Sequence, residues 1–240
     1  MKPLFSFLAF QLFSVCLLAQ TMNVTVANVG NLVKAAAGGG ATYLVQENFE
    51  GSNSGYDLTG WTGVNTPDPD YTTVHLEGAE SLRVSSYGGA WNSFTSDGAT
   101  NFAYCLVRLV GVPVNPQTSI LSLRDASGVM TCQIRGSSAT ADTQIALRVL
   151  SGAADHSTTL LLDTNVTYHC WFSHSTTGWY EIAFSTDGTK PTTGLYYLNT
   201  DGSTEQDGRV YFVVDDVWGY GVIWDKLRIS KIGPIGNSPD

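Results

Sequence analysis

Short apolar runs with a period of two recur along most of this chain, and this alternation constrains the fold more than any other feature. Residues 120–124, 145–149 and 180–184 all place large apolar side chains at every second position. Side chains on a β-strand point alternately to two faces, so this period gives each strand one apolar and one polar face. Turn-forming pairs such as Asp187-Gly188 and Asp201-Gly202 separate the runs. The pattern therefore predicts antiparallel strands that bury one face.

The number of runs predicts an all-β fold, a two-sheet antiparallel jelly-roll sandwich of about eleven or more strands. Composition agrees, because the chain has 22 Ser, 26 Thr and 25 Gly but only 14% charged residues, against roughly 25% in an ordinary domain. We expect the first run to pair with the last, which would close the sandwich. The expected strands are 43–49, 81–85, 102–110, 119–124, 129–135, 144–150, 158–162, 168–173, 179–185, 209–214 and 221–230.

The N-terminal residues predict export from the cell. A single lysine, an apolar stretch over residues 4–18 and then Ala19-Gln20 are typical of a secretory signal peptide. The stretch is shorter than the ~20 residues of a membrane span, and no second one follows. We therefore expect a secreted protein, extracellular or periplasmic, without a membrane span once the signal is removed. The predicted parts are a signal peptide at 1–19, a flexible leader at 20–42, the sandwich at 43–235 and a tail at 236–240.

Charge and cysteine content exclude several partners. The balance of 12 Lys+Arg against 21 Asp+Glu gives a net charge of −9, with no run of basic residues, and this argues against nucleic acid as a partner. Cys105, Cys132 and Cys170 follow the signal segment. They are either one disulfide with a spare thiol or three buried thiols. Their spacing does not fit a zinc site.

Five motifs carry a resemblance to a known family. In order over residues 43–235, they resemble the concanavalin A-like lectin/glucanase superfamily in its laminin-G-like form. Similar opening and closing motifs occur in galactose-binding-like carbohydrate modules, which are usually shorter and are our second choice. Both families are jelly-roll sandwiches that largely bind sugars, so the resemblance implies a sugar ligand. The motifs are Asn48-Phe49-Glu50-Gly51, Gly60-Trp61, residues 76–84, residues 167–172 and residues 223–229.

The residues do not predict catalysis. The glucanase branch of the resembling superfamily carries Glu-x-Asp-x-x-Glu on one strand, and that spacing is absent. No Gly-x-Ser-x-Gly elbow is present either. His169 and His174 are five apart on a predicted strand, so they should project to opposite sides. We therefore expect that the protein is not an enzyme, and keep a glycoside hydrolase as an alternative.

The resemblance also implies a structural calcium ion where the first strand meets the last. Glu50 and Asp225 match those positions, with Glu47 nearby. Carboxylate oxygens are the ligands that calcium prefers. The competing interpretation is that these carboxylates are solvated or paired with Lys226 and Arg228.

Sugar binding needs aromatic rings outside the core together with polar groups for the hydroxyls. We expect Trp61, Trp171, Trp179 and Trp224 to be core, because they lie in the strand pattern. The predicted function is a secreted non-catalytic carbohydrate-binding or surface-recognition module whose partner is a glycan or cell-surface polysaccharide. The main alternative is a structural or adhesive envelope or virion surface protein without a sugar ligand. The candidate ligand-binding residues are Asp215, Asp216, Trp218, Tyr220, Trp91 and Tyr87.

Overall fold

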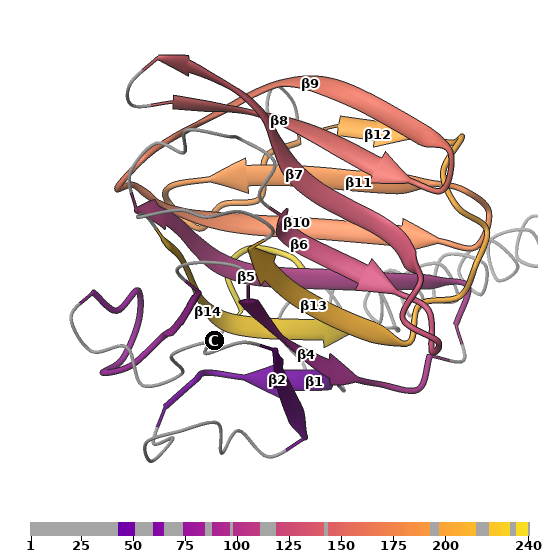
Figure 1. Ribbon diagram of the computed structural model, residues 1–240, viewed down its shortest axis with the longest axis horizontal. Coiled ribbons are helices and arrows are strands. Elements are labelled where there is room, and N and C mark those ends of the chain that lie inside the picture. The colour runs from indigo at the N-terminus through magenta and orange to yellow at the C-terminus, as the bar shows by residue number, and fades with distance from the viewer. Residues whose placement is uncertain are drawn as a thin grey trace, which may run out of the picture. The chain divides into compact units, whose positions relative to one another are not determined.

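The computed structural model describes residues 43–50, 60–64, 74–84, 88–96, 98–110, 119–141, 144–192, 197–214, 221–230 and 234–239. The predicted signal peptide and leader lie outside these residues. Within them the chain forms fourteen strands and no helix (Figure 1). Every strand pairing is antiparallel, and the strands form two sheets.

Sheet A follows the order β1-β14-β5-β10-β11-β12, and β3 also pairs with β14. Sheet B follows the order β2-β4-β13-β6-β7-β8-β9. The predicted all-β, two-sheet antiparallel sandwich of eleven or more strands is confirmed. The bounds of the strands in sheet A are β1 Tyr43–Glu47, β3 Leu82–Val84, β5 Thr100–Val110, β10 Thr167–Ser175, β11 Tyr180–Ser185, β12 Tyr197–Asn199 and β14 Gly221–Ser230. Those in sheet B are β2 Trp61–Val64, β4 Gly88–Ser93, β6 Ser119–Arg124, β7 Met130–Ala141, β8 Gln144–Ser151, β9 Ala154–Asp163 and β13 Arg209–Val214.

Each of the eleven predicted runs overlaps a strand, but β2, β4 and β12 were not predicted. Strand β4 shows why, because it begins Gly88-Gly89-Ala90 and so lacks the apolar alternation. A Cβ on Gly89 would lie 2.4 Å from the backbone oxygen of Phe212 on the neighbouring strand. Glycine is needed there because the backbone of β13 approaches so closely.

The first and last strands pair as predicted. Strand β1 runs antiparallel to β14, from Tyr43 opposite Ser230 to Glu47 opposite Leu227. All ten residues of β14 are buried. This pairing makes β14 an interior strand of sheet A, with β1 on one side and β5 on the other.

An aromatic cluster connects the two sheets inside the sandwich. The ring of Phe212 on β13 stacks on Trp61 of β2, with centroids 5.8 Å apart and planes 9° apart. Its other contacts are Trp224 of β14 at 5.0 Å and Phe49 at 6.2 Å. Trp224 also donates its indole N–H to the carbonyl of Ile120 in the opposite sheet, at 2.6 Å. These contacts fix the spacing of the sheets at this point.

A second apolar cluster lies on the outer face of sheet A. Its buried members include Tyr104, Leu106 and Trp171, and Ile235 of the C-terminal segment packs on them. The indole N–H of Trp171 donates to the carbonyl of Gly236 at 2.7 Å. Trp171 and Trp224 are both buried as predicted, but Trp171 is covered by the C-terminal segment rather than by the opposite sheet.

The three cysteines are buried, free thiols. Cys105 on β5 lies directly opposite Cys170 on β10, and both side chains belong to the core between the sheets. Of the two alternatives that the sequence left open, the structure shows the small buried thiols.

Removing the Phe212 ring tests the importance of the aromatic cluster. We expect Phe212→Ala to lower the free energy of unfolding by about 3–5 kcal/mol, the usual cost of truncating a buried aromatic. Thermal or urea unfolding measures this change. Val129→Ala is the control, because Val129 is 63% exposed and its truncation should cost less than about 0.5 kcal/mol. Similar losses in both variants would contradict this account of the core.

Candidate functional site

Only one of the six predicted ligand-binding residues lies among the described residues. Asp215, Asp216, Trp218, Tyr220 and Tyr87 are outside them, and their role stays a prediction. Trp91 is described, and it lies on β4 in sheet B. The candidate site therefore consists of Trp91 and the side chains around it on sheet B.

Trp91 belongs to a row of side chains that crosses sheet B on its outer face. It lies opposite Thr62 of β2 on one side and Tyr211 of β13 on the other. The row continues to Ser122 of β6 and Gln133 of β7. Neighbouring positions on these strands, such as Val210 and Phe212, belong to the core, so alternation along the strand places this row on the opposite face.

Two arginines stack on the aromatic rings of this face. The guanidinium carbon of Arg209 lies 4.4 Å from the centroid of the Trp91 ring, and that of Arg124 lies 4.2 Å from the centroid of Tyr211. Both rings and both arginines are half-buried. Stacking restricts both partners. The result is a pre-ordered surface in which a guanidinium group lies over one face of each ring. We name it the arginine–aromatic face: Trp91, Tyr211, Arg209 and Arg124.

The charge around this face is unusual for the chain. The six neighbouring strands β2, β4, β13, β6, β7 and β8 contain no Asp, Glu or Lys, but each of the last four carries one arginine. These are four of the seven arginines in a protein with a net charge of −9. The face is therefore cationic, although the whole protein is acidic.

The sequence predicted Trp91 as a candidate ligand-binding residue but not Tyr211, Arg209 or Arg124. The candidate aromatics were those predicted to lie in loops, whereas Tyr211 lies in strand β13, whose sequence is typical of a core strand. The signal that could have found them is the alternation in Arg209-Val210-Tyr211-Phe212. It places an arginine and a tyrosine together opposite the apolar face.

The predicted calcium ligands Glu50 and Asp225 both hold the loop at residues 76–81. Glu50 Oε1 accepts the amide N–H of Ala79 at 2.8 Å. Asp225 Oδ2 accepts the amide of Glu77 at 3.0 Å and the hydroxyl of Ser81 at 2.8 Å. Burial, opposed in part by these hydrogen bonds, raises the pKa of Asp225 to about 6, and the charge of Glu50 adds to the increase.

Glu47 does not join this pair. Its Oε1 accepts the amides of Asn48 at 3.0 Å and Phe49 at 2.8 Å, which closes the turn after β1. The competing interpretation paired Glu50 and Asp225 with Lys226 or Arg228. The ammonium group of Lys226 instead forms an ion pair with Glu77, at 3.0 Å. No group of three His, Cys, Asp or Glu side chains suited to a metal occurs in the part of the chain that the structure describes. Glu50 and Asp225 nevertheless supply oxygen atoms of the kind that calcium prefers, so a structural calcium there stays a proposal.

A chelator titration tests the proposed calcium. If the ion is bound, excess EDTA should lower the melting temperature by several degrees, because a ligand of the folded state stabilises it in proportion to RT ln(1 + [L]/Kd). The double variant Glu50→Gln/Asp225→Asn should show no response, whereas Glu205→Gln, an exposed carboxylate elsewhere, should respond as the wild type does. A wild-type melting temperature unchanged by chelator would rule out a tight calcium site.

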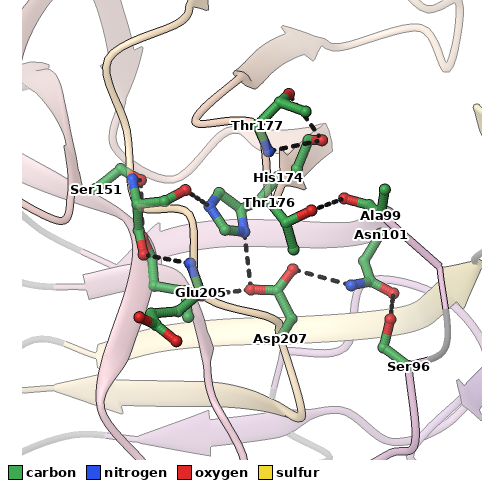
Figure 2. Close-up of polar contacts among 12 residues, drawn as sticks. Ser96, Ala99, Asn101, Ser151, His174, Thr176, Thr177, Glu205 and Asp207 are labelled. Atoms are coloured by element: carbon green, nitrogen blue, oxygen red, sulfur yellow. Dashed lines mark hydrogen bonds and ion pairs between the residues drawn. The ribbon is translucent and has the colours of Figure 1, made fainter.

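A buried polar network occupies the space between the sheets near the start of β5 (Figure 2). His174 donates from Nδ1 to Asp207 Oδ1 at 2.9 Å and from Nε2 to the carbonyl of Ser203 at 2.9 Å. Asp207 also accepts the amide N–H of Asn101 at 3.0 Å and the hydroxyl of Thr131. The side chains of His174 and Asp207 are 0% and 1% exposed.

The two acceptors around His174 define its protonation. A neutral imidazole carries only one N–H, so bonding to both a carboxylate and a carbonyl requires the imidazolium. Burial alone lowers the pKa of His174, but the hydrogen bond and charge of Asp207, with the Ser203 carbonyl, raise it above 6.5. Because Nε2 is bonded to a carbonyl, no serine hydroxyl stands where a nucleophile would be activated. The pair is an internal salt bridge. As predicted, His169 lies on the other side of β10, where the hydroxyl of Tyr104 contacts its Nδ1 at 2.7 Å.

His174 should make stability depend on pH above neutrality. A histidine with a raised folded-state pKa contributes its full stability below about 6.5, and that contribution is lost as pH rises through the folded-state value. The free energy of unfolding should therefore fall from pH 6 to pH 9 in the wild type, and His174→Gln should flatten this slope. His75→Gln, at an exposed position, is the control and should keep the slope. A slope unchanged in His174→Gln would contradict the buried imidazolium.

No helix among the described residues has the length and apolar character to cross a membrane. No model of a known protein family matches the chain, and no curated protein matches it by sequence.

Solved structures with the same fold include carbohydrate-binding and phage-associated β-sandwich modules. Cellulose induced protein Cip1 is 17% identical, with a TM-score of 0.55 over 80% of this chain and 99% of Cip1. A carbohydrate esterase from the Shiga toxin-encoding bacteriophage phi24B is 11% identical, with a TM-score of 0.55 over 81% and 100%. The CBM2 module of the evolved Dit from Lactobacillus casei BL23 phage J-1 is 11% identical, with a TM-score of 0.51 over 82% and 96%. At these identities the likeness shows the fold alone.

The binding domain of botulinum neurotoxin serotype D is a similar case. It is 9% identical with a TM-score of 0.53, and the match covers 79% of this chain but 48% of that domain. Several of the proteins that share this fold are thus described as binding domains or modules.

Proposed function

We propose that this chain is a secreted, non-catalytic carbohydrate-binding module of the concanavalin A-like, laminin-G-like type. It binds a polysaccharide on the outer face of sheet B. The observation that carries the proposal is the cross-strand pair of Trp91 and Tyr211, each stacked by an arginine. Flat rings suit the apolar faces of sugar rings, and fixed donors beside them suit the hydroxyl groups.

The residue content of this face supports binding rather than hydrolysis. Cleavage of a glycosidic bond uses two carboxylates on either side of the scissile bond. The six strands that form the face contain no Asp or Glu at all. Among the similar structures, one is named a carbohydrate-binding module and another an esterase, so a direct assay is needed. We expect no release of reducing ends from any polysaccharide that the protein binds.

Removing the two rings tests the proposal. Trp91→Ala and Tyr211→Ala should each weaken binding to the preferred polysaccharide about tenfold or more, equal to about 1.4 kcal/mol. Aromatic residues usually dominate binding energy in such contacts. Affinity electrophoresis or calorimetry with the full chain, after a screen against plant, algal and bacterial polysaccharides, measures the change.

The control for this experiment is Trp179→Ala. Trp179 is a half-buried tryptophan just before β11 in the other sheet, and its truncation should leave affinity unchanged. Binding that survives in both Trp91→Ala and Tyr211→Ala would contradict a ligand site on this face. If the screen finds no ligand at all, the structural or adhesive surface protein becomes the better account.

A further inference from the structure

The arrangement of charge on sheet B points to a ligand class. Arg209 on β13 lies directly opposite Arg124 on β6, and Arg135 on β7 lies directly opposite Arg148 on β8. Like charges at directly opposed positions of a sheet are destabilising. These two pairs gather four guanidinium groups on one face of an acidic protein, and part of their charge is already engaged, because Arg124 donates to the carbonyl of Gly128 at 3.3 Å and Arg148 contacts Asp155.

The two arginine pairs have a defined relation to the aromatic row. Arg124 is two residues from Ser122, and Arg135 is two residues from Gln133. Because Ser122 and Gln133 belong to the row of Trp91 and Tyr211, one arginine pair lies on each side of it. Arg124 is five positions from Ser119, the residue opposite Arg135, so the pairs are roughly 17 Å apart along the strands. A chain of several sugar units spans such a distance.

The chemistry of these side chains favours a carboxylate. All four cations are arginines, whose planar guanidinium binds a carboxylate with two parallel hydrogen bonds. The anion already present at this face is also a carboxylate, since Arg148 Nη1 contacts Asp155 Oδ2 of β9 at 3.4 Å.

We propose that the ligand of the arginine–aromatic face is a polyuronic acid, bound with its sugar rings against Trp91 and Tyr211, beside the guanidinium groups that stack on them, and with its carboxylates on the arginines of the two opposed pairs. This inference rests on the proposed function and specifies its ligand. The negative charge of the remaining chain repels any polyanion at long range, so binding depends on close contacts at this face.

The experiment compares charged and uncharged polysaccharides with arginine variants of the full chain. The probes are polygalacturonate, alginate and hyaluronate, with hydroxyethyl cellulose and galactan as uncharged counterparts. We expect binding to at least one polyuronate, at least tenfold weaker binding in Arg135→Gln/Arg148→Gln, and a marked loss of affinity as salt rises from 50 to 500 mM. The double variant leaves the stacked rings and their two arginines intact.

Two measurements separate this role from a structural one. The double variant removes an opposed like-charge pair but also the partly exposed ion pair of Arg148 with Asp155, so its free energy of unfolding should change by less than about 1 kcal/mol. A loss of several kcal/mol would instead show that the arginine pair is structural. Arg108→Gln, on β5 of the other sheet, is the matched control and should leave affinity unchanged.

The other outcomes each have a definite meaning. Binding of an uncharged polysaccharide through Trp91 and Tyr211, with no effect of the double variant, would overturn the polyuronate but keep the carbohydrate-binding function. Equal, arginine-dependent binding of dextran sulfate or single-stranded DNA would overturn the choice of carboxylate. Failure to bind any polysaccharide would overturn both proposals.

Discussion

The alternation of side chains along β13 is the constraint on which the fold and the candidate site both depend. Val210, Phe212 and Val214 face the core, and the Phe212 ring contacts aromatic rings of both sheets. Arg209 and Tyr211 point the other way because a strand has a period of two. A shift of one residue in register would exchange the two sets. The packing that stabilises the sandwich therefore also fixes the outward position of the arginine–aromatic face.

Two buried carboxylates of the sandwich, those of Asp207 and Asp225, are held by hydrogen-bond donors. The His174–Asp207 pair is fully buried, a position that is costly for unpaired charges, but Asn101 and Thr131 also bond to the carboxylate (Figure 2). The buried carboxylate of Asp225 on β14 likewise accepts hydrogen bonds, from the hydroxyl of Ser81 and the backbone amide of Glu77. These networks join strands and loops that are distant in sequence. They contribute specificity of arrangement as well as stability.

The outer face of sheet B contrasts with these satisfied networks. There the protein holds arginines directly opposite one another on neighbouring strands. Local departures from the most stable arrangement are expected at functional sites. The same contrast separates this face from the outer face of sheet A, where the C-terminal residues Ile235 and Gly236 cover the aromatic side chains.

Much of the fold was predictable from the sequence, because period-two alternation is a local property of each strand. The strands that were missed are short, or lack the alternation, as Gly88 and Gly89 do in β4. The pairing of the first and last strands was also predicted, because the termini of a domain often lie close together. For the candidate site, the sequence predicted Trp91 from its position after Gly88 and Gly89, and its role in binding stays a prediction.

The sequence by itself determined which residues of each strand share a face, and hence that the sandwich is all-β and buries Trp224. Apart from the pairing of the first and last strands, only the tertiary structure decided which strands are neighbours. Arg209 and Arg124 are 85 positions apart in the sequence, yet they lie opposite each other because β13 pairs with β6 across a long connection. His174 and Asp207 likewise meet only when β10 and the segment before β13 enter the same interior. Side-chain direction follows from local geometry, whereas cross-strand neighbours depend on strand order, which no local pattern encodes.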